Sequence, residues 1–351
     1  MQKISLCMII KNEEKVLDRC LKSAQNIVDE IIIVDTGSSD NSKKIAKKYT
    51  NKIYDFEWCD DFAKARNFSF SLASNEYIMW LDADDIIPKS SQRKILNLKE
   101  NMSADTYMIK YKMLDKKNKV NLIFYRERII KNCTLSNWQG VVHECITPFG
   151  KIEYLDCAIH HKKYKITNPN RNLEIYKNIV KNRELNTREL YYFARELYDH
   201  KKYRKSIQIF KEFLSNKNGW IENVIDAYYM IAQCYLILNK PNLALKNVTK
   251  LLNLVEPKPN ICCLIGDILL TQSRYKLSTY WYILATKQKI NTISGAFINP
   301  YFTTKYPYLQ LCYCYYMLGD LTQSKQYNNK VLKIDKTNPI ALNNKKFFDN
   351  L

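Results

Sequence analysis

The chain has 351 residues, which allows two domains with hydrophobic cores of ordinary size. Its 55 lysines and arginines outnumber its 35 acidic residues, and the formal net charge of +20 favours anionic ligands. The lysines are spread along the chain without an arginine–aromatic nucleic-acid motif, so we expect no nucleic-acid partner.

Predicted strands and helices alternate at the start of the chain. Residues 4–10 are a short apolar run typical of buried parallel strands, and apolar residues at helical spacing follow over 16–21. A second strand is predicted over residues 30–34, then a helix with a lysine-rich face over 42–48 and a short strand near 53–54. This alternation predicts a parallel sheet with crossover helices.

An acidic segment follows the next apolar run. Residues 77–81 are predicted as a strand and lead into Asp82-Ala83-Asp84-Asp85. Because strand residues alternate faces, Asp82 and Asp84 can point the same way at the carboxyl edge of the sheet, where α/β proteins bind ligands. Their oxygens suit Mg²⁺ or Mn²⁺ bridging a diphosphate. An acidic turn without a ligand is the alternative, and Asp85 fits a continued turn or a helix cap.

Four segments in this order resemble the donor site of the inverting family-2 glycosyltransferases, which have the GT-A fold. These segments are residues 5–14, Val34–Asp40, the Arg66-Asn67 pair and Asp82–Asp84. The resemblance covers roughly residues 1–165. It implies an α/β, Rossmann-like domain that binds a nucleotide sugar.

The resemblance places the nucleobase at the end of the second strand. Asp35 would accept a hydrogen bond from the base, usually uracil, and Asn12 and Glu13 would line the nucleotide pocket. The implied donor substrate is a UDP-sugar. On the residues alone, Asp35 also fits a simple turn cap.

The other matching positions would hold the sugar-phosphate part of the donor. By resemblance, the Arg66-Asn67 pair shapes the donor pocket, Asp82 lies near the ribose and Asp84 holds the metal ion. A guanidinium matches phosphate or carboxylate geometry well, and a metal ion stabilises a departing diphosphate. A salt bridge from Arg66 to Asp61 is the alternative for the arginine.

A second group of candidate residues follows a strand predicted around residues 124–128. Inverting sugar transfer requires a base that takes the proton of the acceptor nucleophile. The segment Gly140-Val141-Val142-His143-Glu144 resembles the Gly-x-Val-His-Glu sequence on the acceptor side of one branch of the family. Glu144 is therefore the first candidate for the base and His143 the second. A His-Glu pair satisfied by local hydrogen bonds is the alternative.

Residues 158–164 resemble the His-x-Gly-Tyr segment that closes the catalytic domain in this branch. His161 and Tyr164 occupy the matching positions, but Lys163 replaces the usual glycine and makes a positive φ unfavourable there. By this match His161 would complete the metal site as a ligand of Mn²⁺. A surface histidine in a lysine-rich turn is the alternative.

The chain becomes helical in character beyond residue 170. Ala194, Ala232 and Gly266 align with separations of 38 and 34 residues, and a fourth unit is predicted over Leu309–Ile334 after an insertion through residues 295–304. A period near 34 indicates tetratricopeptide repeats. Stacked helix pairs present a concave surface, so we expect acceptor binding or homodimerisation there. A helical domain that only buttresses the enzyme is the alternative.

Three parts are therefore expected along the chain. They are a GT-A catalytic domain over residues 1–165, a linker helix within 166–186, and tetratricopeptide-like helical repeats over 187–351. The turn signal Thr167-Asn168-Pro169-Asn170 marks the boundary between the first two.

Cysteine usage and the chain start indicate a cytoplasmic protein. The 11 cysteines are odd in number and show no paired metal-ligand spacing, which is typical of reduced thiols. Met1-Gln2-Lys3 leads directly into the first predicted strand without room for a signal peptide, and no apolar stretch reaches ~18 residues, so we expect no transmembrane segment.

The combination of domains resembles the peptide S-glycosyltransferases that modify cysteine in glycosylated bacteriocins. It implies sugar transfer from a UDP-sugar to a peptide cysteine, with Mg²⁺ or Mn²⁺ as the cofactor. A saccharide or lipid-linked acceptor in cell-surface glycan synthesis is the alternative. A non-catalytic repeat scaffold is a hypothesis of another class, against which the acidic residues at positions 35, 82, 84 and 144 argue.

Overall fold

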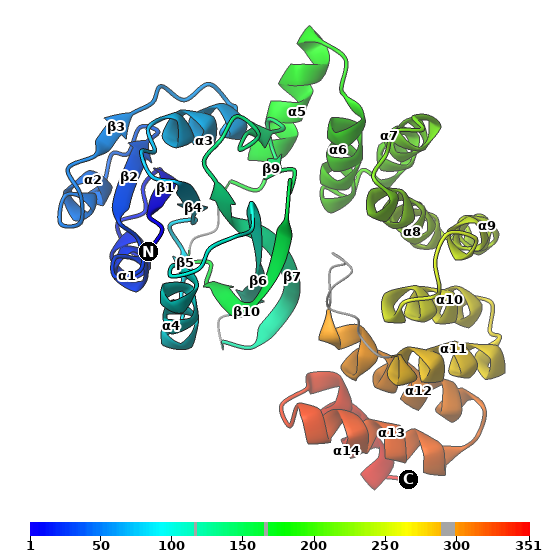
Figure 1. Cartoon of the computed structure of the whole chain (residues 1–351). Coiled ribbons are helices and arrows are strands. Elements are labelled where there is room, and N and C mark those ends of the chain that lie inside the picture. The colour runs from blue at the N-terminus through cyan, green and yellow to red at the C-terminus, as the bar shows by residue number, and fades with distance from the viewer. Residues whose placement is uncertain (116–117, 165–167, 289–298) are drawn as a thin grey trace. The chain divides into compact units, whose positions relative to one another are not determined.

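The computed structural model describes residues 1–115, 118–164, 168–288 and 299–351. The chain divides into two units, and the division lies between Ile175 and Tyr176. The first unit is an α/β structure, and the described residues of the second form helices (Figure 1). The turn predicted over Thr167–Asn170 lies partly outside the described residues.

A sheet of mixed direction forms the centre of the first unit, with the strand order β3-β2-β1-β4-β7-β6-β10-β5 among the described residues. The first four of these strands run parallel, as the alternating sequence predicts. They are β1 (Ile4–Ile10), β2 (Glu30–Asp35), β3 (Ile53–Asp55) and β4 (Tyr77–Trp80). Their carboxyl ends therefore meet at one edge of the sheet.

The remaining strands add an antiparallel part that the alternating pattern does not indicate. They are β5 (Asp85–Ile86), β6 (Thr106–Leu114), β7 (Val120–Lys131) and β10 (Ile152–His161). β7 pairs antiparallel with both β4 and β6, while β10 is parallel to β6. The connection from β6 to β7 is too short for a helical crossover, which needs about a dozen residues, so these strands form a hairpin.

Helices cover both faces of this sheet (Figure 1). They are α1 (Leu17–Ala24), α2 (Ser42–Ala46), α3 (Phe62–Ser71) and α4 (Lys89–Leu98). Successive side chains of β4 point to opposite faces of the sheet and pack in two cores. Met79 packs in the core that includes α1 and α4. Trp80 packs in the core that includes α3 and a two-stranded ribbon, formed by β8 (Trp138–Gln139) and β9 (Cys145–Ile146). Trp80 is therefore directed towards α3 and this ribbon.

The second unit is built from antiparallel helix pairs joined by short turns, as the repeat spacing predicts. The pairs are α6 (Thr187–Asp199) with α7 (Tyr203–Ser215), α8 (Ile221–Ile237) with α9 (Pro241–Leu252), α10 (Pro259–Thr271) with α11 (Tyr275–Lys287), and α12 (Lys305–Met317) with α13 (Leu321–Ile334). α14 (Pro339–Asp349) follows them, and α5 (Arg171–Asn182) precedes them. Part of the predicted insertion over residues 295–304 lies outside the described residues, and its described end includes the 3₁₀ turn Pro300–Thr303.

The small residues that reveal the repeat lie where the two helices of a pair touch. Ser206 donates its hydroxyl to the carbonyl of Ala194 at 2.7 Å, and Ser324 makes the same bond to Cys312 at 2.7 Å. At Gly266 an added Cβ would lie 2.6 Å from ring carbons of Tyr282. The small residues that recur in the sequence therefore mark positions where the two helices of a pair are in close contact.

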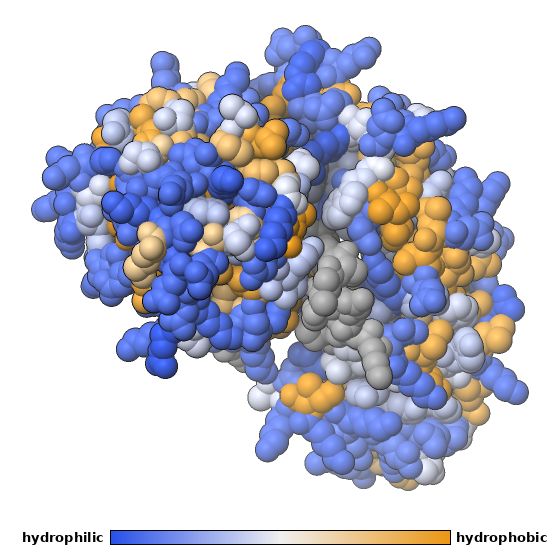
Figure 2. Space-filling view, in the orientation of Figure 1, coloured by the Kyte–Doolittle hydropathy of each residue, from blue (hydrophilic) through white to orange (hydrophobic). Residues whose placement is uncertain are grey.

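The visible surface of the molecule is mainly hydrophilic, with apolar residues in separate patches (Figure 2). This agrees with the large excess of lysine in the chain. In the part of the chain that the structure describes, no helix has both the length and the apolar character needed to cross a bilayer.

A carboxylate lies within the helical core of the second unit. Asp267 of α10 accepts hydrogen bonds from the hydroxyls of Tyr282 at 2.6 Å and Tyr306 at 2.8 Å. Burial raises the pKa of Asp267 to about 6, although the two hydroxyl bonds act in the opposite direction. The folded protein therefore binds a proton here more tightly than the unfolded chain does.

We expect the stability of the protein to depend on pH through Asp267. Since its folded pKa of about 6 lies above its unfolded value, the wild type should gain stability as pH falls from about 7 to 4, by ~3 kcal/mol at most. Asp267→Asn lacks this titration, so its advantage in the free energy of unfolding should be largest at pH 8 and shrink towards pH 4. Urea titrations at several pH values, with Asp349→Asn on the exposed face of α14 as the control, measure this difference. A difference that does not change with pH would contradict the assignment.

Candidate functional site

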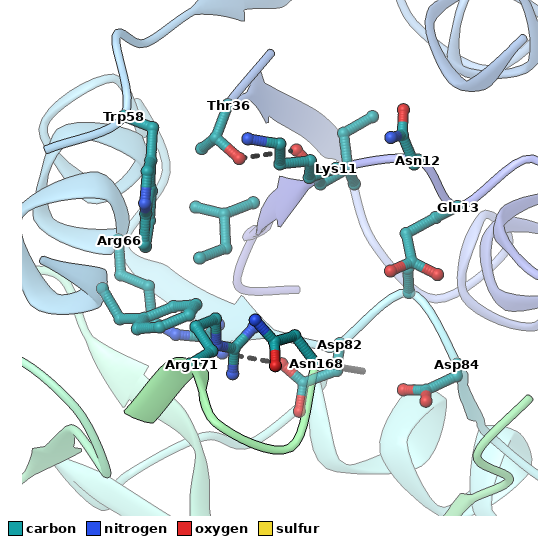
Figure 3. Close-up of a pocket in the computed structure, with 14 residues that line it drawn as sticks. Lys11, Asn12, Glu13, Thr36, Trp58, Arg66, Asp82, Asp84, Asn168 and Arg171 are labelled. Carbon is teal, nitrogen blue, oxygen red and sulfur yellow. Dashed lines mark hydrogen bonds and ion pairs between the residues drawn. The ribbon is translucent and has the colours of Figure 1, made fainter. Parts of the chain in front are cut away.

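A cavity of about 570 Å³ opens at the carboxyl ends of β1, β2 and β4 (Figure 3). Its polar lining comes from three places in the sheet: the residues after β1, the residue after β2 and the residues after β4. These residues are Lys11, Asn12, Glu13, Thr36, Asp82 and Asp84. Arg66 of α3 and the later residues Asn168 and Arg171 complete the polar lining. The position of the cavity is the one that α/β sheets use for ligands.

Asp35 ends β2 and is fully buried; it does not line the cavity, but the next residue, Thr36, does. Its Oδ1 accepts hydrogen bonds from the backbone N–H groups of Gly37 at 2.9 Å and Ser38 at 2.7 Å, in a turn where Gly37 has φ of +96°. Its Oδ2 is buried and has no hydrogen-bond partner among the described residues. Because a buried acceptor without a partner is costly, this oxygen is suited to an N–H group of a ligand.

Asn12 and Glu13 line the cavity and also brace the loop that follows β2. Asn12 adopts φ of +55°, and its Oδ1 accepts a hydrogen bond from the N–H of Ser39 at 2.7 Å. The backbone N–H of Glu13 donates to Oγ of Ser42 at 2.7 Å. These bonds tie the loop after β1 to the loop after β2, so the mouth of the cavity is held from both sides.

Arg66 connects the acidic turn after β4 with the segment between β8 and β9. Its Nη2 donates to Oδ1 of Asp82 at 2.7 Å, and its Nε donates to Oε1 of Glu144 at 2.7 Å. The guanidinium carbon lies 5.2 Å from the ring centre of Trp80 and 4.7 Å from that of Trp138. Burial lowers the pKa of Arg66, but the two carboxylates raise it by more, so the arginine stays charged. The alternative partner, Asp61, instead caps α3 through the N–H of Lys64.

Asp82 is held in its ionised form by the same contacts. Burial raises the pKa of this carboxyl, but the charges of Arg66 and Arg128 lower it further, to well below the usual range. Asp82 and Glu144 are therefore two carboxylates held by one guanidinium. Glu144 lies in this network, while His143 is the preceding residue of the segment, with φ of +55°.

Asn67, a predicted donor-site residue, makes two hydrogen bonds with the backbone of Trp138. Its Nδ2 donates to the carbonyl of Trp138 at 3.0 Å, and its Oδ1 accepts from the N–H of the same residue at 2.8 Å. It does not line the cavity. In the structure this side chain fixes the start of β8, which carries the tryptophan that lies against Arg66.

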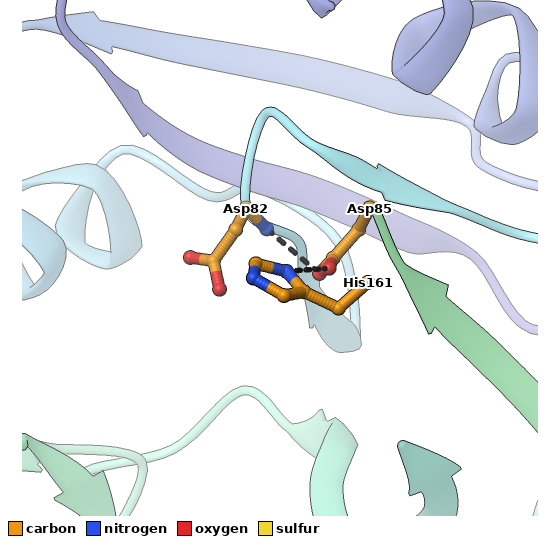
Figure 4. A group of neighbouring side chains, drawn as sticks. All are labelled: Asp82, Asp85 and His161. Carbon is orange, nitrogen blue, oxygen red and sulfur yellow. Dashed lines mark hydrogen bonds and ion pairs between the residues drawn. The ribbon is translucent and has the colours of Figure 1, made fainter. Parts of the chain in front are cut away.

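His161 places an imidazole beside the acidic turn. It ends β10 and pairs with Asp85 of β5 in the sheet. Its Nδ1 lies 3.2 Å from Oδ1 of Asp84, 3.1 Å from Oδ1 of Asp85 and 2.7 Å from the hydroxyl of Tyr111. One ligand atom each from Asp82, Asp85 and His161 lie within 4.8 Å of one another (Figure 4). His161 therefore belongs to a strand and contacts the acidic turn, rather than lying in a surface turn.

Asp85 has a different environment from its two neighbours in the motif. It is fully buried, and its Oδ2 accepts from Nη1 of Arg128 at 3.1 Å and from the N–H of Asp82 at 3.0 Å. Its Oδ1 accepts from the hydroxyl of Tyr111 at 2.7 Å. Asp85 therefore holds the acidic turn and His161 in place, and it does not cap α4, which begins after Pro88.

Asp84 is the carboxylate of the motif that remains for a cation. It lines the cavity, and among the described residues it has His161 but no lysine or arginine as an ion-pair partner. Burial raises the pKa of Asp84 to about 6; His161 lowers it, while Asp82, Asp85 and Glu13 raise it. In return, the pKa of His161 is lowered by burial but raised overall by Asp85 and Asp84.

The donor set fits Mg²⁺ or Mn²⁺. Asp84 supplies a hard oxygen ligand, and the imidazole of His161 is held by the carboxylate of Asp85 through Nδ1. This second contact is the arrangement by which proteins orient a metal-binding histidine.

Several residues that shape the site carry little signal in the sequence. Tyr111 and Arg128 belong to strands whose local patterns show only that they are strands, although charged residues inside the run Phe124–Ile130 are a signal that some of them are paired in the interior. Asn168 and Arg171 lie in the region expected to be a linker, and no local pattern distinguishes them.

The first part of the chain is similar to known proteins. Residues 5–149 match Glycosyl transferase family 2. The SPbeta prophage-derived glycosyltransferase SunS of Bacillus subtilis is 25% identical over 299 residues, which cover 79% of this chain and 69% of SunS.

Two further similarities are shorter or more distant. A TPR repeat-containing protein of Synechococcus elongatus is 44% identical over 85 residues, which cover 24% of this chain and 21% of that protein. Among solved structures, residues 1–349 of TarS from S. aureus align with a TM-score of 0.38 at 17% identity, covering 85% of this chain and 96% of that chain.

We expect the buried pair of Arg128 and Asp85 to be essential for stability. Both side chains are 0% exposed, so Arg128→Met should lower the free energy of unfolding by about 3–5 kcal/mol because Asp85 would be left buried without its cation. Adding Asp85→Asn to this variant should recover part of the loss. Urea denaturation measures both, with the exposed Arg93→Met as the control. Equal loss in the single and double variants would show that packing, rather than the charge, is responsible.

Proposed function

We propose that the chain, whose residues 5–149 match Glycosyl transferase family 2, transfers a sugar with inversion from a UDP-sugar, with Mg²⁺ or Mn²⁺, to an external acceptor. The observation that carries this proposal is the buried Oδ2 of Asp35, which has no partner among the described residues. A uracil ring offers one imide N–H, which can donate to this oxygen. Asn12 and Glu13 would then lie beside the nucleoside.

The other end of the donor would meet the acidic turn. Asp84 and His161 would hold the metal ion, and Asp82, fixed by Arg66, would accept a hydrogen bond from the ribose. When bound, the ion supplies charge that stabilises the departing diphosphate. Asp85 would keep the imidazole of His161 oriented through the contact between its Oδ1 and Nδ1 of the histidine.

Glu144 is proposed as the base that takes the acceptor proton. Its Oε1 is bound by Nε of Arg66, so Oε2 can receive the proton while the side chain stays in place. Because the same guanidinium holds Asp82, the positions of the donor and of the base are set by one side chain. This shared support favours Glu144 over His143.

A peptide cysteine is the proposed acceptor, supported by the Gly-x-Val-His-Glu segment together with helical repeats in one chain. The repeats would present the acceptor or join two copies of the protein. A saccharide or lipid-linked acceptor is the second candidate, and the experiment below separates the two.

The donor class can be tested with a panel of nucleotide sugars in the presence of Mn²⁺. We expect slow hydrolysis of a UDP-sugar and addition of a sugar mass to cysteine-containing peptides, an addition that cysteine-to-serine peptides lose. Hydrolysis without peptide modification would move the acceptor to saccharides or lipids. Absence of both activities and of nucleotide binding would contradict the proposed function.

The metal site can be tested with Asp84→Asn. We expect the affinity for Mn²⁺ and the metal-dependent part of UDP binding to fall by at least about tenfold, because the variant loses an anionic oxygen ligand. Titration calorimetry measures both quantities, and Asp156→Asn, whose side chain is 84% exposed, is the matched control. Unchanged Mn²⁺ affinity would remove Asp84 from the metal site.

The two candidate bases can be compared directly. Glu144→Gln should lower kcat by about 10²–10⁴-fold while the Kd for UDP changes little, since general-base catalysis acts in the transfer step. His143→Gln should keep kcat within a few-fold of the wild type. Steady-state kinetics with a saturating donor make the comparison, and the reverse order of the two effects would assign the base to His143.

A further inference from the structure

The turns inside three successive helix pairs of the second unit are built alike. In the turns of α6–α7, α8–α9 and α10–α11, one residue has a positive φ, and the next residue donates its backbone N–H to a carbonyl five positions back. This helix end favours glycine, and Gly319 has that place in the turn from α12 to α13. The other three turns carry Lys201, Asn239 and Ser273 there, with φ of +58°, +55° and +57°. The shared geometry makes the residues of the three turns equivalent one by one.

Cations occupy equivalent places in these turns. The residue after the positive-φ position is Lys202 in the first turn, Lys240 in the second and Arg274 in the third. Residues 200–205, 238–243 and 272–277 contain no acidic residue, and the nearest one in the sequence is Asp199. The lysines and arginines of these segments are exposed, and among the described residues none forms an ion pair or a side-chain hydrogen bond; they are Lys201, Lys202, Arg204, Lys205, Lys240, Arg274 and Lys276.

The three turns are neighbours along one edge of the second unit. A hollow of about 450 Å³ is lined by residues 201–205 of the first turn and by Leu238 of the second. In the third turn, Nε2 of Gln272 donates to Oδ1 of Asn242 in the second at 3.1 Å. Residues 200–205, 238–243 and 272–277 therefore form one continuous surface, the basic edge.

Large apolar side chains lie among the cations of the basic edge. Leu243 and Leu277 are equivalent residues in the first turns of α9 and α11, and they are 41% and 45% exposed. Removing them from water requires a partner with an apolar layer. A phospholipid surface has such a layer directly beneath its charged headgroups, whereas a nucleic acid presents mainly phosphate charge. A flat membrane surface can also meet several adjacent turns at once.

We propose that the basic edge binds the surface of an anionic phospholipid membrane, with the cations at the lipid phosphates and the two leucines at the boundary of the acyl layer. This inference is independent of the proposed function. The backbone at Lys201 supports it, because a lysine with positive φ is strained where a glycine is not. Such strained residues are concentrated at binding and functional sites.

The charge of the basic edge is tested with the full chain and sedimented vesicles of phosphatidylcholine, with and without phosphatidylserine. One triple variant removes the three equivalent cations by Lys202→Gln, Lys240→Gln and Arg274→Gln. The control variant removes the same total charge from exposed residues outside the edge, by Lys217→Gln, Lys336→Gln and Lys345→Gln.

The wild type should bind the vesicles that contain phosphatidylserine and should not bind phosphatidylcholine alone. The edge variant should bind about 100-fold more weakly, because each cation at an anionic surface contributes roughly fivefold. The control variant should stay within about threefold of the wild type, since charges beyond a Debye length are screened.

Two further variants separate membrane binding from loss of folding and from simple charge attraction. Lys201→Gly should weaken vesicle binding by about fivefold while its Tm stays at or above that of the wild type, because glycine accepts a positive φ. Leu243→Ser with Leu277→Ser should weaken vesicle binding by at least about tenfold without changing the number of charges.

Three outcomes would overturn the inference. They are failure of the wild type to bind phosphatidylserine vesicles, an equal loss in the edge and control variants, and vesicle binding that does not change when the leucines are replaced. In the last case, binding of poly-glutamate or of poly-uridylate, also unchanged by the leucine substitutions, would assign the edge to an acidic protein or to a nucleic acid.

Discussion

One buried guanidinium joins two segments of the first unit that lie far apart in the sequence. Arg66 extends from α3 to Asp82 in the turn after β4 and to Glu144 between β8 and β9. A charge in the interior is tolerated only when it is paired, so the three side chains stabilise one another in a single arrangement. The three carboxylates of the acidic motif have different partners. Asp82 neutralises Arg66, and Asp85 neutralises Arg128. Asp84 faces the cavity and has no lysine or arginine as an ion-pair partner among the described residues.

Three arginine side chains lie against the ring of Trp80. The guanidinium carbons of Arg66, Arg126 and Arg128 lie 5.2, 4.8 and 3.6 Å from its ring centre. The indole face attracts cations but does not cancel their charge, so each arginine also needs a carboxylate partner. The acidic turn begins two residues after Trp80, so the end of β4 supplies the aromatic face and the turn supplies the neutralising carboxylates.

Local patterns in the sequence were sufficient for only some of the elements. Apolar runs of strand length and the period near 34 predicted β1 to β4 and the helix pairs, because these signals depend on neighbours in sequence. Other contacts join residues more than forty positions apart, and no local pattern encodes them. They are the antiparallel pairing of β7 with β4, the ion pair of Asp85 with Arg128, and the hydrogen bonds of Asn67 with Trp138. Arg171 belongs to the same class, since its meaning depends on where the start of α5 lies.

In the proposed donor complex, the half-satisfied carboxylate of Asp35 would also affect the choice among nucleotides. Its Oδ1 is saturated by two backbone N–H groups, so only Oδ2 can meet a base, and it can only accept. A cytosine ring would present the lone pair of its N3 to this oxygen and would leave a buried negative charge against an acceptor. Selection at this position would therefore operate by repelling the wrong base, at a cost of about 1–3 kcal/mol for an unsatisfied buried group, rather than by gripping the right one more tightly.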